Sequence, residues 1–269
     1  MFEKVKEDNH KFYCYRGELI KNINICGISL KYIGLEKDKM DWGGKFYVPL
    51  QYIQYNDDNS VLIQSFPEFM DFAVDSIRKF HGDLFSKNTF DYLYNYLSEE
   101  LKKSFNIIPN TDWYENFSVG YGIHGKSGLN ISKKQDTTVM FDENTEYEII
   151  EKYIKIDKNI KGLYYGTLIE NKIVSTAGWN NYHYFIDYPD SVNVVEIGSG
   201  THEDYRNKGY AVSNVVSMAE SILDKGLYAV YNTASWNISS QKTAKSAGFS
   251  EIRRWKMFVF KQEEINDKQ

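Results

Sequence analysis

Apolar and polar residues alternate in several short runs of the first 110 residues, and this period of two is typical of half-buried β-strands. Turn residues such as Gly43-Gly44 separate the runs, and two stretches of helical period follow, one beginning at Pro67 and one at Asn88 or Thr89. The sequence therefore predicts an N-terminal α+β region over residues 1–110, whose role it does not reveal. The predicted strands lie at 23–25, 28–32, 45–50 and 60–64.

The pattern is interrupted over residues 111–136. Four glycines, at positions 120, 122, 125 and 128, fall among Asn, Ser and Asp residues in this stretch. Such a composition is typical of loops, whether they carry function or only connect domains. We therefore predict a loop-rich connection here.

Residues 137–269 alternate between strand and helix patterns. The helix opening near Gly209 is the clearest, because its apolar residues recur at helical spacing up to Leu223 and Lys225-Gly226 ends it. A second, short helix begins at Asn237 and ends at Gly248. The other expected elements are strands at 137–141, 194–201, 227–233 and 251–260, a helix at 144–154 and a hairpin at 162–178.

The turn between the strand at 194–201 and the helix at Gly209 has the features of an anion-binding site. The first N–H groups of a helix have no intrahelical partner, and the helix dipole places partial positive charge there, so a diphosphate can bind mainly to the backbone. Gly209 permits close approach and a positive φ. Arg206 and Lys208 add charge beside it.

The hexapeptide Arg206-Asn207-Lys208-Gly209-Tyr210-Ala211 resembles the pyrophosphate-binding signature of the GNAT superfamily of N-acetyltransferases: Arg or Gln, two residues, Gly, one residue, then Gly or Ala. The helix that runs from Asn237 to Gly248-Phe249 is similar to the second characteristic GNAT segment. The resemblance covers roughly residues 140–262. Within the superfamily, the run from Glu196 to Ala211 is similar to a bacterial group that includes zwittermicin-type resistance acetyltransferases.

The resemblance implies a GNAT fold over 137–269, that is, an α+β domain with a mixed central β-sheet flanked by helices, and acetyl-CoA as co-substrate. It implies that the backbone at Thr201 pairs with pantetheine and that Asn237 reaches the same arm, with Ser240 one turn further on. A simple helix N-cap is the alternative role of Asn237. The residues expected around the pyrophosphate are Arg206, Asn207, Lys208, Gly209, Tyr210 and Ala211.

Glu196 is the candidate catalytic base. On an extended strand it shares a face with Gly198 and Gly200, which leaves open space beside the carboxylate. In many GNAT enzymes an acidic residue on this strand takes the proton of the amine. The alternative is an ion-pair partner or a group that only attracts a cationic substrate. His202 and Glu203, close by, are interpreted as solvated turn residues.

The sequence departs from the GNAT pattern at Ala244, where a Tyr often protonates the leaving thiolate. Either the thiolate leaves unassisted, or Tyr210, Ser240 or a residue of the N-terminal region replaces the phenol, or the protein binds coenzyme without transfer. Five aromatic residues are candidates for the wall of an acceptor site or for ordinary packing: Trp179, Tyr182, Tyr184, Phe185 and Trp236.

Composition excludes several classes. The net charge of −5 gives no support for a nucleic-acid partner, and no apolar run approaches membrane-spanning length. Cys14 and Cys26 are too few for a disulfide framework or a metal cluster, so no metal is expected. The charged N-terminus lacks the pattern of a signal peptide, which favours a cytoplasmic protein.

The sequence thus predicts an acyltransferase that moves an acetyl group from acetyl-CoA to a primary amine of a small molecule. Acetylation of a protein N-terminus or lysine is the alternative substrate class. A catalytically inactive CoA-binding sensor or interaction module is the alternative outside enzymes. The oligomeric state is left open, a homodimer included.

Overall fold

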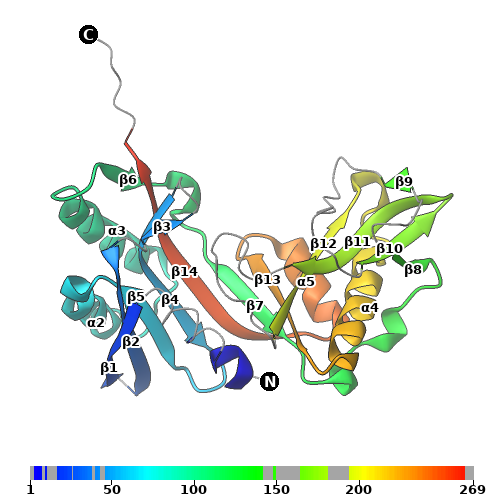
Figure 1. Cartoon of the computed structure of the whole chain (residues 1–269), viewed down its shortest axis with the longest axis horizontal. Helices are drawn as coiled ribbons and strands as arrows, with labels where there is room; N and C mark the ends of the chain where they lie inside the picture. The colour runs from blue at the N-terminus through cyan, green and yellow to red at the C-terminus, as the bar shows by residue number, and fades with distance from the viewer. Residues whose placement is uncertain are drawn as a thin grey trace, which may run out of the picture.

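A computed structural model describes residues 3–7, 10, 17–25, 27–37, 40–42, 46–141, 148–149, 164–180 and 194–263. Its strands form one continuous mixed sheet in the order β1-β2-β5-β4-β14-β7-β13-β12-β11-β10-β8, with β3, β6 and β9 beside this path. Two neighbouring pairs along the path are parallel, β2 with β5 and β12 with β13. With helices packed against this sheet, the protein is of the α+β class (Figure 1).

The strands predicted in the first 110 residues are confirmed, and most are longer than expected. A capping prediction was wrong: Ser86, not Asn88 or Thr89, caps the second helix, because its Oγ accepts from the Thr89 N–H at 3.4 Å. The elements are β1 (Gly17–Ile25), β2 (Ile28–Leu35), β3 (Asp41–Trp42), β4 (Phe46–Tyr55), β5 (Val61–Ser65), α2 (Met70–Lys79), α3 (Lys87–Leu101) and β6 (Ile107–Pro109).

In the C-terminal half the predicted hairpin, strands and helices around the signature are confirmed. Glu170 and Asn171 both have positive φ, as a two-residue hairpin turn requires. The elements are β8 (Thr138–Phe141), β10 (Tyr164–Ile169), β11 (Lys172–Asn180), β12 (Val194–Thr201), α4 (Tyr210–Asp224), β13 (Tyr228–Ala234), α5 (Ile238–Ala247) and β14 (Ser250–Gln262).

Two expectations are corrected. The segment 111–136 is not only loop, since β7 (Ser118–Gly122) lies inside it and pairs with both β13 and β14. The sequence did not predict this strand because glycine is generally depleted in strands. The helix expected over 144–154 lies largely outside the described residues, and the part described, β9 (Glu148–Ile149), is a strand paired with β11.

Strand β14 joins the two halves. It pairs with β4 and β6 along its C-terminal part and with β7 at its beginning, so it crosses the middle of the molecule (red in Figure 1). Phe258 and Phe260 of this strand belong to the core formed by α2, α3 and the N-terminal strands. The last strand therefore completes a sheet and a core that begin near residue 20.

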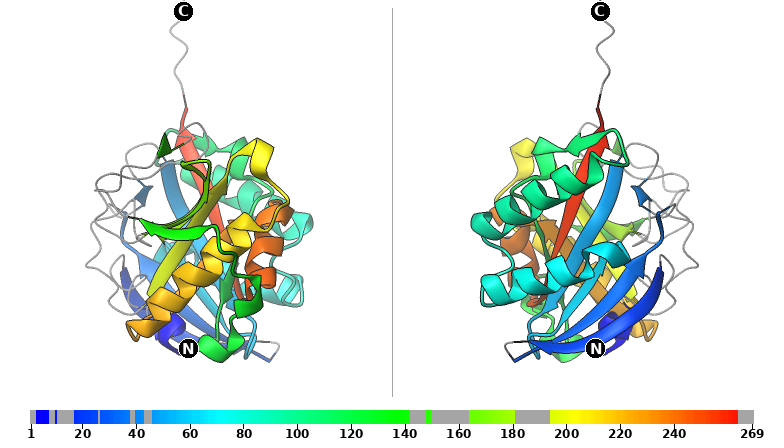
Figure 2. Two further views of the ribbon diagram at one scale, coloured as in Figure 1. Left: turned by 90° about the vertical axis from the view of Figure 1, so that its right-hand side faces the viewer. Right: turned by 90° about the vertical axis from the view of Figure 1, so that its left-hand side faces the viewer.

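Helices α2, α3, α4 and α5 gather on one face of the sheet, whereas Val5 of the helical segment 3–7 packs with Val194 and Val230 on the other face. Figure 2 shows α2, α3 and α5 along the same side. Apolar residues of α4 and α5 pack on Val195, Ile197 and Tyr231, which therefore point toward the helices. Because side chains alternate along a strand, the intervening residues such as Glu196 and Asn232 lie on the opposite face. We call these the helix face and the open face.

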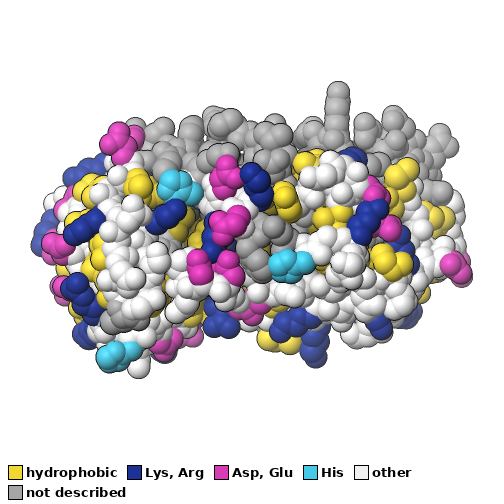
Figure 3. Space-filling model, turned by 90° about the horizontal axis from the view of Figure 1, so that it is seen from below, with side chains coloured by type: hydrophobic (Ala, Val, Ile, Leu, Met, Phe, Trp, Pro, Cys, Tyr) yellow, Lys and Arg dark blue, Asp and Glu magenta, His cyan; other side chains and the backbone are white. Residues whose placement is uncertain are grey.

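On the surface, acidic and basic side chains are interspersed over the underside of the molecule (Figure 3). Within the described part of the chain, none of the helices is both long and apolar enough to span a bilayer.

Candidate active site at the opening between β12 and β13

Strands β12 and β13 separate part of the way along. Their parallel pairing covers only the first three residues of each strand and ends at Glu196 opposite Val230. Beyond this point β12 still pairs with β11 on its other side, as far as Thr201 opposite Ser175. The edge of β12 that faces β13 therefore carries backbone groups from Ile197 to Thr201 that no described strand pairs with. An extended ligand could pair with this edge as a further strand does.

The turn before α4 lies beyond the same end of β12. Gly209 occupies the N-cap position with φ +80°, and Asn207 also has positive φ. No side chain of the described residues caps this helix, unlike α3 and α5. The first N–H groups of α4 are therefore available to an anion, and the dipole of a 15-residue helix adds to the attraction.

The side chains around this turn hold it without filling it. The Arg206 Nε donates to the Thr201 carbonyl at 3.3 Å, and Gln135 Nε2 donates to the Lys208 carbonyl at 3.0 Å. A Cβ on Gly209 would lie 2.9 Å from that same Gln135 Nε2, besides straining a left-handed backbone. Arg206, Asn207, Lys208 and Gly209 are exposed, while Tyr210 and Ala211 begin the helix half-buried.

On the open face, Glu196 begins a row of polar side chains that crosses three strands. Its Oε2 accepts from Asn232 Nδ2 at 3.0 Å, and Asn232 Oδ1 accepts from Arg253 Nη2 at 3.3 Å. Burial raises the pKa of Glu196 to about 7, against the smaller opposing effect of the Asn232 hydrogen bond. A carboxyl with this pKa can take and release a proton near neutral pH.

Gly120 makes room for this row. A Cβ there would lie 2.8 Å from Arg253 Cγ and 3.0 Å from Asn232 Oδ1. The glycine that favoured a loop in the sequence is thus a strand residue, small because Arg253 crosses over it. Arg253 is buried, at 1% exposure.

On the helix face, three hydroxyl groups lie together at the opening. The Tyr231 hydroxyl is 2.8 Å from Ser199 Oγ of β12 and 2.9 Å from Ser240 Oγ of α5. A phenol therefore bridges the two sides of the gap, although position 244 has none. Sequence reasoning missed Tyr231, and the available signal was its place beside Asn232, since neighbouring strand residues face opposite sides.

The other candidates are placed as follows. Ala244 of α5 is fully buried. Asn237 is the N-cap of α5, and its Oδ1 accepts a hydrogen bond from the Ser240 N–H at 3.1 Å. The capping role is therefore observed, and its Nδ2 is a donor in addition. His202 begins a 3-10 turn, accepting from the Asp204 N–H at 3.4 Å, and Glu203 is exposed.

The five aromatic candidates do not form one wall. Trp179 packs on the helix-face core, with Lys225 Nζ 5.7 Å from the centre of its ring. Trp236 is 65% exposed at the end of β13 and lines a separate cavity. Tyr182, Tyr184 and Phe185 lie outside the described residues.

No protein-family model matches this chain, and no curated protein matches it. Among solved structures, it is similar to a GNAT-family acetyltransferase from Colwellia psychrerythraea (16% identity, TM-score 0.43, 85% of each chain covered). A GCN5-related N-acetyltransferase from Sphaerobacter thermophilus aligns at 10% identity and a TM-score of 0.44, with 82% of each chain covered. A putative acetyltransferase of the GNAT family from Novosphingobium aromaticivorans aligns at 15% identity and a TM-score of 0.43, over 59% of this chain and 69% of that one. Similarity at this level says nothing about substrate or mechanism, which depend on the residues of the site.

Proposed function

We propose that this protein is an acetyltransferase of the GNAT type, which moves an acetyl group from acetyl-CoA to a primary amine. The observation that carries the proposal is the opening between β12 and β13, with an uncapped helix N-terminus beyond one end of it. A strand-like pantetheine arm suits the unpaired edge of β12. A diphosphate suits the N–H groups at the start of α4.

The donor is held mainly by backbone in this proposal. Residues 206–211 surround the diphosphate, with Arg206 and Lys208 adding charge. The backbone near Thr201 pairs with the pantetheine arm, and Asn237 Nδ2 and Ser240 lie on the helix side of that arm. Main-chain recognition of this kind depends on Gly209, because a side chain there would stand between the phosphate and the N–H groups.

The base and the acid then lie on opposite faces of the sheet. Glu196 takes the proton of the bound ammonium, directly or through water, and the neutral amine nitrogen attacks the thioester carbonyl carbon. A C–N bond forms and the nitrogen gives up its second proton to water. The C–S bond breaks, and the departing thiolate receives a proton from the Tyr231 hydroxyl, which Ser199 and Ser240 position and which regains a proton from water. Tyr231 fills the role left open by Ala244.

A small-molecule amine is the proposed acceptor, and the cavity described in the next subsection favours it over a protein N-terminus or lysine. Glu196 and Tyr231, which offer a base and an acid at the opening, favour transfer over the inactive CoA-binding module, which Ala244 favours. The narrower likeness to zwittermicin-type acetyltransferases stays a prediction, as do the cytoplasmic location and the oligomeric state.

Coenzyme binding is the first test. Acetyl-CoA at a hundredfold excess over Kd should stabilise the folded protein by about 2.7 kcal/mol, which raises Tm by roughly 5–10 °C. Gly209→Val should abolish this shift. Gly226→Val is the matched control, because Gly226 has φ +73° at the other end of the same helix and open space around its Cβ position.

The two variants should lose similar stability from backbone strain, and only Gly209→Val should lose the coenzyme. An unchanged Tm of the folded wild-type protein at millimolar acetyl-CoA and CoA would remove the basis of the proposal. Retained binding by Gly209→Val would move the diphosphate to another part of the surface.

A further inference from the structure

A cavity of about 270 Å³ lies where β7 and β13 end beside β14. Ser118, Ala234 and Trp255 line it and are cross-strand partners in one row. Along their strands, Ser118 is two positions from Gly120, Ala234 is two positions from Asn232, and Trp255 is two positions from Arg253. The strands pair without a register shift between these two rows. The cavity therefore opens on the same face of the sheet as Glu196, about 6–7 Å along the strands from Asn232.

The walls of the cavity are aromatic. Three of the five tryptophans of the chain line it, Trp113, Trp236 and Trp255, together with Phe117 and Met257. A dry cavity of roughly 150 Å³ is enough to hold a benzene ring. The volume and lining suit one aromatic ring with a short chain, bound by apolar contact and by the faces of the indoles.

One charged side chain limits what the cavity accepts. Among the described residues of the lining, Asp112 is the only charged one, and no described residue forms an ion pair with it. A cationic ligand fits this charge and these indole faces, and an anionic one does not.

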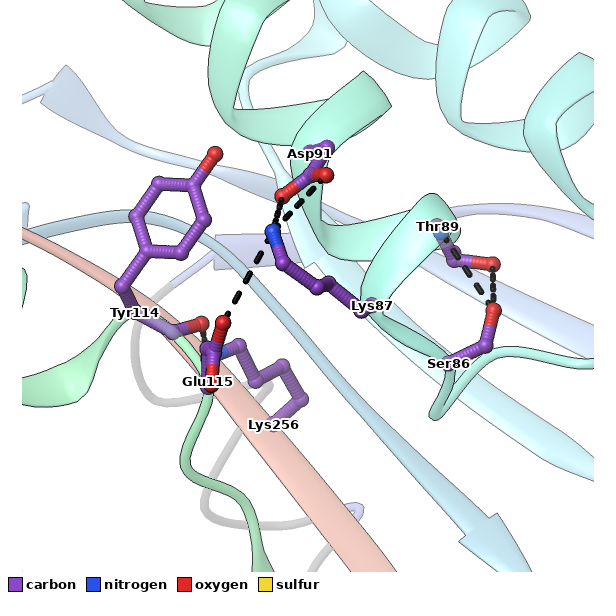
Figure 4. Close-up of polar contacts among 7 residues, drawn as sticks. All are labelled: Ser86, Lys87, Thr89, Asp91, Tyr114, Glu115 and Lys256. Carbon is purple, nitrogen blue, oxygen red and sulfur yellow. Dashed lines mark hydrogen bonds and ion pairs between the residues drawn. The ribbon is translucent and has the colours of Figure 1, made fainter.

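The wall formed by residues 112–117 is held firmly. Lys256 Nζ donates to the carbonyls of Trp113, Tyr114 and Asn116, each at 2.8 Å. From helix α3, Lys87 Nζ lies 2.8 Å from Asp91 Oδ1 and 3.6 Å from Glu115 Oε1 (Figure 4). Because buried and surface contacts fix this segment from both sides, the cavity is preorganised for a ligand.

We infer that this cavity is the acceptor site, and that it takes arylalkylamines: a primary amine joined by two or three carbons to an aromatic ring. The ring lies between Trp236 and Trp255, and the amine reaches back to Glu196. The inference rests on the proposed acetyl transfer for its reaction, but the binding it describes needs no acetyl-CoA.

Binding is measured by intrinsic tryptophan fluorescence in the absence of acetyl-CoA, with tyramine, phenylethylamine and 3-phenylpropanol as probes. Both amines should give saturable changes. The neutral alcohol should bind at least about tenfold more weakly than phenylethylamine, because it lacks the charge.

Two variants locate the effect. Trp236→Leu should weaken both amines about tenfold or more. Met140→Ala is the matched control, since Met140 is another exposed apolar side chain, at 59%, and lies on β8 away from the cavity. It should change neither affinity.

The preference for the amines over the alcohol in the wild-type protein is a test that needs no variant to fold. Absence of saturable binding, or amine affinities unchanged in Trp236→Leu, overturns the inference. If acetyl-CoA still raises Tm in that case, the acetyl-transfer proposal stands and only the acceptor site is wrong. If acetyl-CoA has no effect while the amines bind as expected, the cavity is an amine site of a protein with another activity.

Discussion

The two faces of the sheet at the opening differ in chemistry. The helix face presents neutral hydroxyl groups, Tyr231 with Ser199 and Ser240, beside the exposed start of α4. The open face presents ionisable groups, Glu196 and Arg253, joined through Asn232. Tyr231 and Asn232 are neighbours in the chain, so a single step along β13 separates the two environments.

This difference shows how a strand can keep an acid and a base apart. Adjacent side chains of a strand point to opposite faces of the sheet. Beyond Glu196, where β12 no longer pairs with β13, side chains on both faces lie beside the same gap. In the proposed reaction, the base Glu196 and the acid Tyr231 therefore approach a thioester in the gap from opposite faces of the sheet.

The largest expected effect is on the open face. Glu196→Gln should lower kcat roughly 10²–10⁴-fold at neutral pH with nearly unchanged affinity for acetyl-CoA, because the amine then has no base. The rate of the variant should recover as the pH approaches the pKa of the amine itself. In the wild-type protein kcat/KM should rise with pH through an apparent pKa near 7.

The control is Glu203→Gln, which removes an exposed carboxylate close to the site and should leave the pH profile unchanged. Steady-state rates of thiol release across pH 6–10 make the measurement. A Glu196→Gln protein with wild-type kcat and a raised KM for the amine at every pH would show that Glu196 only attracts the cation.

The next effect is on stability. The pKa of Glu196 is raised by folding from 4.5 to about 7, so the neutral form is favoured in the folded state. This contribution is complete below pH 4.5 and is lost as the pH rises to about 7, because over this range the carboxyl ionises in the unfolded chain while the folded protein keeps it neutral. At 1.36 kcal/mol for each unit, the loss is about 3 kcal/mol.

Glu196→Gln cannot ionise, so its free energy of unfolding should rise relative to wild type by about 3 kcal/mol between pH 4.5 and pH 8. Urea denaturation of both proteins at the two pH values measures this difference, from which other titrating groups cancel. A constant difference would mean that the carboxyl is well solvated, and its use as a base near pH 7 would lose support.

The smallest effect is expected on the helix face. Tyr231→Phe should lower kcat about tenfold, because a thiolate is a modest base and can leave with little help. The loss should shrink when the acyl donor has a more acidic thiol. Tyr121→Phe is matched closely, since Tyr121 pairs with Tyr231 across β7 and β13 and donates to Gln241 at 3.1 Å on the same face.

Tyr231→Phe loses two hydrogen bonds and Tyr121→Phe loses one, so the stability of Tyr231→Phe should fall somewhat further. Only Tyr231→Phe should depend on the leaving group. Equal kcat values for the two variants would assign Tyr231 to structure and leave the thiolate unassisted.

Local patterns were enough to predict most of the C-terminal half. The strand at Val194–Thr201, the turn at Gly209 and the helix after it each carry their own signal in consecutive residues. The confirmed hairpin likewise needed only a two-residue turn. Such elements are read correctly because the interactions that form them are close in sequence.

Features that depend on distant residues were missed. Gly120 indicated a loop, and only Arg253, brought alongside by β14, explains why a strand there needs glycine. The Tyr231 phenol reaches its position through Ser199 and Ser240 on other elements. The cavity is lined by residues from three strands and by the segment near residue 113. No spacing of residues in the sequence predicts that these parts of the chain come together.

Strand β14 also determines how the chain must fold. The Tyr47 hydroxyl donates to Gln262 across 215 positions, and closing a loop of that size costs about 5 kcal/mol of chain entropy. Until this closure happens, β4 keeps an unpaired edge and the core around α2 and α3 lacks Phe258 and Phe260. A slow-forming intermediate with an exposed apolar edge is prone to associate with other copies. We therefore expect late closure of this one strand to compete with aggregation when the protein is refolded, so that the yield falls as the protein concentration rises.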